Sequence, residues 1–173
     1  MMADYVQSIQ LAPDGVVNEI YPEEGNEAAK IDLVNDEKRG AIVRYGIDND
    51  IVVMHGPFTL SQGGMGIAIR NPIYLYNEDG ERYFWGLAII IIKVPEIFND
   101  SVNALESFGY DYILSKTESP LSSDYNVIDS SKQELDNPVS YTFELGGCMW
   151  KLDVTPVCLL YTSPSPRDRS VSR

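Results

Sequence analysis

His55 has the widest chemical repertoire of any residue in this sequence, and it is the chain's only histidine. An imidazole titrates near neutral pH and serves as a general acid, a general base or a metal ligand. A zinc site or a Ser/His/Asp triad would have to be built around this one ring. No partner is identifiable by spacing, so His55 is most simply a residue at the end of a strand. The alternative is a soluble hydrolase or isomerase that uses His55 with Asp32 or Asp50 in a cleft.

Other short motifs have the composition of ligand sites but lack essential parts. The glycine-rich run at 62–66 has no third glycine in the required place and no Lys-Ser/Thr pair, so it predicts a turn and not a phosphate loop. Residues 48–50 look like the opening of a calcium loop without its later glycine and glutamate. Cys148 is most simply a core or edge thiol. From the residues alone, we expect no catalytic group, no metal site and no cofactor.

The charge balance limits the partners that the chain can bind. Its 173 residues include 13 Lys and Arg against 26 Asp and Glu, for a formal net charge of −13. Such a charge disfavours nucleic acid and anionic lipid. Apolar residues make up 44% of the chain, enough for one globular domain or two small ones. The longest apolar run, at 87–92, is far shorter than the roughly 20 residues of a membrane-spanning helix and predicts a buried strand.

Turn signals and apolar periodicity predict an α+β fold in which antiparallel strands form a curved sheet with helices on one face. Pro13-Asp14-Gly15 and Asn77-Glu78-Asp79-Gly80 each mark a hairpin turn. Apolar residues spaced by three and four indicate a helix that ends at Gly109. The expected strands are 8–11, 16–21, 51–54, 66–76, 82–94, 110–114, 139–145 and 150–154, and the expected helices are 35–47 and 98–108.

The last hairpin has alternating apolar residues on both strands. Because successive side chains of a strand point to opposite faces, Tyr141, Phe143, Trp150 and Leu152 should all point inward.

Residues 158–173 have a different composition from the rest of the chain. They are polar and rich in Pro and Ser, which is typical of a disordered end. The run from Cys158 to Asp168 also resembles, codon by codon, the translation of a common transposon-based sequencing adapter. We therefore expect 158–173 to be a non-native, adapter-derived tail on an incomplete gene and to pack against nothing.

Short runs of distinctive sequence occur in order between residues 8 and 98. They are IQLAPDGVV (9–17), IYP (20–22), IDL (31–33), HGPFTL (55–60), QGGMGI (62–67), RNPIY (70–74) and FWG (84–86). Together they resemble the CHASE domain, an extracellular sensory module of transmembrane histidine kinases, nucleotide cyclases and diguanylate cyclases, including plant cytokinin receptors. Weaker similarity continues at 109–112 and 150–156.

The resemblance implies a sensor that is not itself an enzyme. It implies two PAS-like lobes, a membrane-distal ligand-binding lobe at 5–95 and a membrane-proximal lobe at 96–157, with a long N-terminal helix that would precede Tyr5 and is missing here. The parent protein would be anchored in a cell membrane, with this part periplasmic or extracellular, and would act as a homodimer. A small-molecule ligand would be its partner, and binding would be passed to an intracellular kinase or cyclase.

The resemblance also assigns a ligand contact to Asp32. In cytokinin-binding members an aspartate after the first strand pair hydrogen-bonds the ligand's ring, and the Ile31-Asp32-Leu33 context puts Asp32 at that position. An ordinary exposed acid is the alternative. A shift of one residue would bring Ile31 or Leu33 to the ligand instead.

Three further positions match ligand-binding positions of the family. Met54 corresponds to an apolar wall of the pocket, or else to plain core. Gly63 stands where cytokinin receptors carry a hydroxyl residue, which puts adenine-type specificity in doubt. Gly86 would let the sheet backbone approach a ligand, or would mark a bulge.

Overall fold

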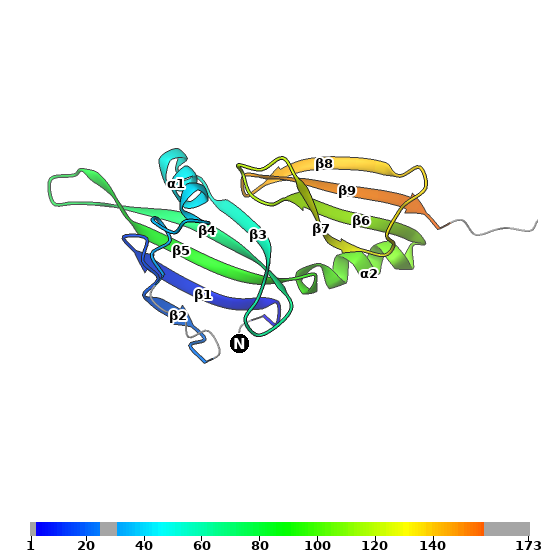
Figure 1. Ribbon diagram of the computed structural model, residues 1–173, viewed down its shortest axis with the longest axis horizontal. Coiled ribbons are helices and arrows are strands. Elements are labelled where there is room, and N and C mark those ends of the chain that lie inside the picture. Colours follow the sequence, from blue (N-terminus) through cyan, green and yellow to red (C-terminus); the bar gives the residue numbers. More distant parts are fainter. Residues whose placement is uncertain (1–2, 25–30, 158–173) are drawn as a thin grey trace, which may run out of the picture.

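The chain folds into two antiparallel sheets, shown in Figure 1. The computed structural model describes residues 3–24 and 31–157, so residues 158–173, which we expect to be an adapter-derived tail, lie outside the described residues. The expected α+β fold of antiparallel sheets with short flanking helices is confirmed. We call the five-stranded sheet with its helix the first lobe and the four-stranded sheet with its helix the second lobe. The chain passes from one sheet to the other at Pro95.

The first lobe has the strand order β2-β1-β5-β4-β3. The second lobe has the order β7-β6-β9-β8. The first lobe consists of β1 (Val6–Pro13), β2 (Glu19–Tyr21), α1 (Gly40–Asn49), β3 (Val53–Thr59), β4 (Met65–Tyr76) and β5 (Arg82–Val94). The second consists of the 3-10 turn η1 (Glu96–Phe98), α2 (Asn99–Ser107), β6 (Tyr110–Thr117), β7 (Tyr125–Ser130), β8 (Val139–Leu145) and β9 (Cys148–Pro156).

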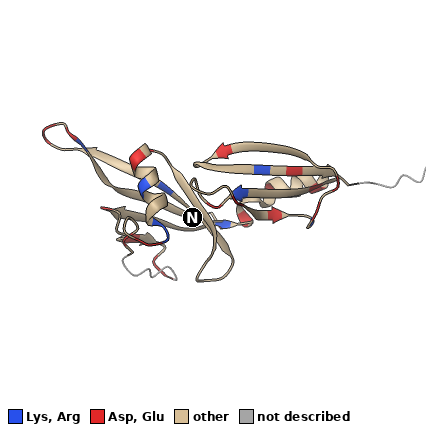
Figure 2. Cartoon of the chain, turned by 45° about the horizontal axis from the view of Figure 1, so that its top comes forward, with Lys and Arg blue, Asp and Glu red and all other residues tan. Residues whose placement is uncertain are grey.

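The β4–β5 hairpin is the longest feature of the first lobe. Its turn is fixed by Asn77, whose side-chain oxygen accepts hydrogen bonds from the backbone N–H groups of Asp79 and Glu81. Figure 2 shows acidic residues at this tip, away from the sheets. Strand β5 then lies between β1 and β4, so Leu87 and Ile89 are buried as expected of the apolar run, whereas Ile90 is 39% exposed on the other face.

The pairing register determines which side chains share a face of the first sheet. Ile89 lies opposite Gln10 on β1 and opposite Arg70 on β4, and Ile91 lies opposite Ser8. Directly paired residues point to the same side of a sheet. Polar residues from β1 and a charged residue from β4 therefore stand on one face, above the apolar centre of β5.

The segment before α1 folds over this face. Val16 and Val17 do not continue β2 as expected but pair with the segment at 31–33 through the Val17 N–H to Ile31 O and Leu33 N–H to Gly15 O bonds. The helix expected at 35–47 begins later, at Gly40. The reason is that the carboxylate of Asp36 accepts bonds from the backbone N–H groups of the next residues and holds them in a turn.

The two lobes share a buried core. Side chains from the first sheet pack in one cluster with side chains from the second sheet, and the partly buried Phe98 at the end of η1 joins them. The buried members of this cluster are Met54, Ile67, Ile92, Val94, Leu114, Ile128, Cys148 and Trp150. We therefore expect the lobes to unfold together.

Strand β3 is bonded to both lobes. It pairs with β4 along the first sheet, and its other side meets the second lobe through the Met54 N–H to Gly146 O bond (2.8 Å) and the Gly56 N–H to Glu118 O bond (3.0 Å). Lys116 of β6 is fully buried, and its ammonium group donates to the Gly56 carbonyl oxygen at 2.8 Å. The same group also donates to the carbonyls of Thr117 and Glu118.

The last hairpin differs from expectation at one residue. Trp150 is 3% exposed, and Phe143 and Leu152 are half-buried, as expected. The prediction for Tyr141 is wrong, because it is 67% exposed. It stacks on Phe143, with ring centroids 5.9 Å apart, so its face is as expected, but β8 is an edge strand and the described chain leaves the ring uncovered.

Candidate functional site

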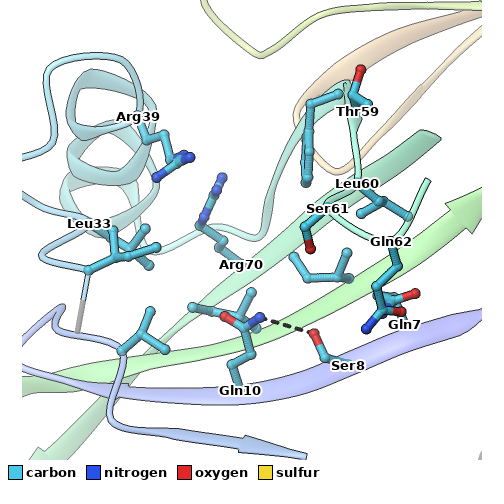
Figure 3. Close-up of a pocket in the computed structure, with 15 residues that line it drawn as sticks. Gln7, Ser8, Gln10, Leu33, Arg39, Thr59, Leu60, Ser61, Gln62 and Arg70 are labelled. Atoms are coloured by element: carbon cyan, nitrogen blue, oxygen red, sulfur yellow. Dashed lines mark hydrogen bonds between the residues drawn. The ribbon is translucent and has the colours of Figure 1, made fainter. Parts of the chain in front are cut away.

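A cavity of about 590 Å³ lies on the covered face of the first sheet. Its floor is formed by β1, β4 and β5, one wall by the 31–39 segment, and the other by the end of β3 and the loop that follows (Figure 3). Its apolar lining residues are Val17, Ile31, Leu33, Phe58, Leu60, Ile89 and Ile91, and its polar ones are Gln7, Ser8, Gln10, Arg39, Thr59, Ser61, Gln62 and Arg70.

Arg70 is the most unusual residue of this cavity. Its side chain stands in the middle of β4, and the residue is only 4% exposed. Within the described chain, its Nε and Nη1 atoms have no hydrogen-bond partner. Burial, reinforced by the charge of nearby Arg39, lowers the pKa of Arg70 to about 10, so it stays a cation at neutral pH. A buried and incompletely bonded cation is costly, and such groups concentrate at functional sites.

Arg39 brings a second guanidinium group to the cavity from the turn before α1. It is partly neutralised by Asp36, whose carboxylate lies 3.3 Å from Arg39 Nη1. Figure 3 shows the side chains of Arg39 and Arg70 converging on the same part of the cavity.

The opposite part of the cavity carries neutral polar groups. Gln10 donates from its side-chain amide to the Ser8 hydroxyl at 3.0 Å, and Gln7 donates to the Gln62 side chain at 2.6 Å. Amide and hydroxyl groups can exchange such bonds for bonds to a ligand. The cavity therefore has a cationic end, a neutral hydrogen-bonding end and apolar walls, as small-molecule sites generally have.

Asp32 lies outside the lining of the cavity. Its carboxylate is exposed and accepts bonds from the Asn35 side-chain amide (2.7 Å) and backbone N–H (3.1 Å), and these hydrogen bonds lower the pKa of Asp32. Its neighbours Ile31 and Leu33 do line the cavity, because side chains alternate along the bridged segment. A direct contact of Asp32 with ligand stays a prediction of the resemblance.

The other three family-derived positions lie apart from one another and from the cavity lining. Met54 is 7% exposed in the core shared by the lobes, and it borders a separate apolar cavity of about 310 Å³ beside α2. Gly63 sits in the β3–β4 turn with a φ of 90° and open space around it. Gly86 is packed so tightly against β1 that a Cβ atom would lie 2.4 Å from the Ala12 carbonyl oxygen, which explains this glycine by strand packing.

His55 is not joined to an acid that would make it a catalytic base. Asp50 pairs with Arg82, and the carboxylate of Asp32 bonds Asn35. The nearest acid to the imidazole is Glu118, at 4.0 Å from Nε2. The geometry does not favour the hydrolase or isomerase alternative. Among the described residues, no group of three or more His, Cys, Asp or Glu side chains is placed to hold a metal ion.

The burial of His55 makes a prediction about acid stability. Desolvation, reinforced by the charges of Arg70 and Arg39, lowers the pKa of His55 from 6.5 to about 4. Between these two values the unfolded chain takes up a proton at His55 and the folded chain does not, so stability is lost as the pH falls through this window. Between pH 7 and pH 4.5, the free energy of unfolding of His55→Gln should therefore fall by about 1–3 kcal/mol less than that of the wild type. Urea denaturation from pH 7 to pH 4.5 measures it, and superimposable pH profiles of variant and wild type would contradict it.

Arg70 is the central site residue that the sequence-based prediction does not name, and the other polar lining residues are not named either. In the sequence, Arg70 stands out only within the RNPIY run of the family resemblance. The available signal was the alternation of β4, in which Ala68 and Arg70 share one face and the apolar Ile67 and Ile69 share the other.

Solved structures similar to this chain are receptor domains. An extracellular ligand-binding receptor from Desulfohalobium retbaense DSM5692 has a TM-score of 0.56 at 13% identity, over 87% of this chain and 30% of that chain. The ligand-binding domain of the Pseudomonas aeruginosa PAO1 amino acid chemoreceptor PctC, solved with GABA, has a TM-score of 0.47 at 13% identity, over 87% of this chain and 74% of that one. At such identities the first likeness concerns the fold alone. This chain spans less than a third of the length of the first.

A search of the curated proteins found no match. The model of the CHASE domain family matches residues 6–124, which is more than half of the chain. The match covers the whole first lobe, including every described residue of the cavity lining, and extends through β6 into the second lobe. With the ordered sequence runs and the two antiparallel lobes, it establishes that the chain belongs to the CHASE domain family.

Proposed function

We propose that the chain senses a small molecule through the cavity of its first lobe. CHASE domains are sensory and not catalytic, so the sensor assignment and the absence of enzyme activity expected from the resemblance are confirmed at family level. The observation that carries the choice of cavity is Arg70, a buried cation in a cavity of about 590 Å³, with two nitrogens that have no hydrogen-bond partner among the described residues.

The parent protein is, in this proposal, a membrane receptor with a histidine kinase or a cyclase, such as a diguanylate cyclase, on the cytoplasmic side. The family resemblance and the extracellular receptor of similar fold support a periplasmic or extracellular place for this part. No helix in the described residues is long and apolar enough to span a membrane. Homodimerisation of the parent belongs to the same proposal, because paired sensor domains can pass a change of conformation to paired output domains.

The experiment that tests the cavity compares two tryptophan variants on one strand. Ile91 lines the cavity, and its neighbour Ile90 points to the opposite face of the same sheet. We expect Ile91→Trp to weaken binding at least tenfold by filling the cavity, and Ile90→Trp to leave it unchanged. Ligands are found first by thermal shift with a panel of purines, organic acids, amino acids and short peptides, and affinities are then measured by calorimetry.

A second cavity-filling variant protects the test against misfolding. Ser61→Trp places an indole from the exposed β3–β4 loop and should block binding in the same way. Equal affinity of wild type, Ile91→Trp and Ser61→Trp would place the ligand elsewhere, and a panel without a single binder would count against the cavity as a sensor site. Asp32→Ala belongs in the same titrations, since the resemblance predicts a loss of roughly tenfold to a hundredfold for a direct charge-assisted contact.

A further inference from the structure

The cationic end of the cavity holds a charge that the described chain does not balance. Two guanidinium groups, those of Arg70 and Arg39, meet one carboxylate, that of Asp36. One net positive charge therefore remains at this end. None of the lining residues that the structure describes is an acid.

The geometry gives Arg70 the main role at this end. Arg39 already bonds Asp36 and has a side chain that is 38% exposed, so water and Asp36 stabilise its charge. Arg70 has less of both, since it is 96% buried and Asp36 acts on it through charge without a hydrogen bond. Among the described residues, two of its three guanidinium nitrogens have no hydrogen-bond partner. Figure 3 shows its side chain rising from the floor into the cavity. A protein retains such a group where a ligand completes its hydrogen bonds.

The net charge of the cationic end and the apolar lining of the cavity together indicate which class of anion would fit. One net positive charge is matched by a monoanion, whereas a phosphate near neutral pH carries close to two negative charges. The planar guanidinium group also suits the planar carboxylate. Ile89 lies beside Arg70 across the sheet, and Gln10 lies on the other side of Ile89. Ile31 and Leu33 add apolar lining, so an apolar body with a polar far end fits the remaining space.

We infer that the cavity recognises a small monocarboxylic acid, whose carboxylate is bound by Arg70 with Arg39 at its side and whose partly apolar body lies on β5. This inference rests on the proposed function, because it names the ligand class of the same cavity. It predicts that the acid group, more than the shape of the body, decides affinity.

The test uses matched sets of probes. Hexanoate, benzoate and 3-phenylpropionate are each titrated beside the corresponding primary amide, which keeps the shape and removes the charge, and inorganic phosphate is a separate arm. We expect at least one acid to bind tenfold or more tightly than its amide. If every amide binds as tightly as its acid, the inference is overturned while the cavity remains a ligand site. Phosphate that binds more tightly than every acid would overturn the assignment to carboxylates.

A pair of arginine variants locates the effect. Arg70→Met removes the charge and keeps much of the volume, and we expect it to weaken binding of the acid at least a hundredfold and of the amide much less. Arg82→Met is the matched control, since Arg82 pairs with Asp50 outside the cavity. Wild-type affinity of Arg70→Met for the acid would overturn the inference.

The melting temperature of the free protein gives a readout independent of any ligand. Because Arg70→Met removes an uncompensated buried charge, the ligand-free variant should melt above the wild type. A melting temperature at or below that of the wild type would show that Arg70 stabilises the fold, which would contradict its assignment as an anion-binding group. If none of these acids and amides binds but another ligand of the wider panel does, and Ile91→Trp blocks it, the inference fails and the proposed function stands. If neither the probes nor the panel yields a binder, the proposed function itself is contradicted.

Discussion

Replacing Trp150 by alanine is expected to lower the free energy of unfolding by about 3–5 kcal/mol, as large truncations in a core do. Trp150 is 3% exposed and packs against Phe98 and Phe143, with ring centroids 5.8 Å and 6.1 Å away. Its indole N–H also donates to the Leu145 carbonyl oxygen at 3.2 Å. Chemical denaturation followed by fluorescence and by circular dichroism measures the loss.

The matched control for this variant is Tyr141→Ala. Tyr141 lies on the same face of the same hairpin but is 67% exposed, so its loss should cost less than about 1 kcal/mol. Because Trp150 belongs to the core shared by both sheets, the whole chain should unfold in one transition in either variant. A cost below about 1 kcal/mol for Trp150→Ala, or two separate transitions, would contradict the shared core.

The second large effect is expected at Lys116. Its pKa is lowered by burial, and its ammonium group donates to three backbone carbonyls, one of them on β3 in the first lobe. Lys116→Met fills a similar volume but leaves these carbonyl groups with fewer donors in a buried place. Unpaired buried acceptors cost roughly 1–3 kcal/mol each, and some will find water, so we expect a total loss of about 2–4 kcal/mol.

Lys151→Met is the control for the lysine variant. Lys151 pairs with Asp153 at 2.9 Å, but its side chain is 38% exposed, and such pairs contribute little. Urea denaturation of the two variants under the same conditions compares them directly. Equal stability of Lys116→Met and wild type would show that the three carbonyls have other donors.

The sequence predicts the strands better than the site. The reason is that alternating apolar and polar residues show where a strand lies and which residues share a face. The period of two along β8 and β9 and the continuous apolar run of β5 identify these strands, and glycine-containing turns locate the hairpins. Alternation does not show which face is later covered. Tyr141 was assigned to the correct face and is exposed, because only the order of strands makes β8 an edge.

The same limit applies to the cavity. The 31–39 segment covers the cavity, and it is held there by pairing with Val16 and Val17. Local sequence patterns do not predict this pairing, because the two segments are far apart in the sequence. Arg70 becomes a buried cation only when this segment is in place. Strand β7 was missed for a related reason: its polar sequence pairs with β6 at a sheet edge, where side chains need not be apolar.

Strand β3 gives the domain a property that neither lobe has alone. One end of this strand supplies Phe58 and Thr59 to the cavity wall, and its middle accepts the bond from Lys116 of the second lobe. We expect a ligand that moves the wall to alter the bonds at Gly56, and thermodynamic linkage makes such an influence reciprocal. A change in the second lobe that disturbs Gly56 should alter ligand affinity by the same factor as the ligand alters the second lobe. Lys116 does not line the cavity. The change in ligand affinity caused by Lys116→Met therefore measures the coupling between ligand binding in the first lobe and the contacts of the second lobe.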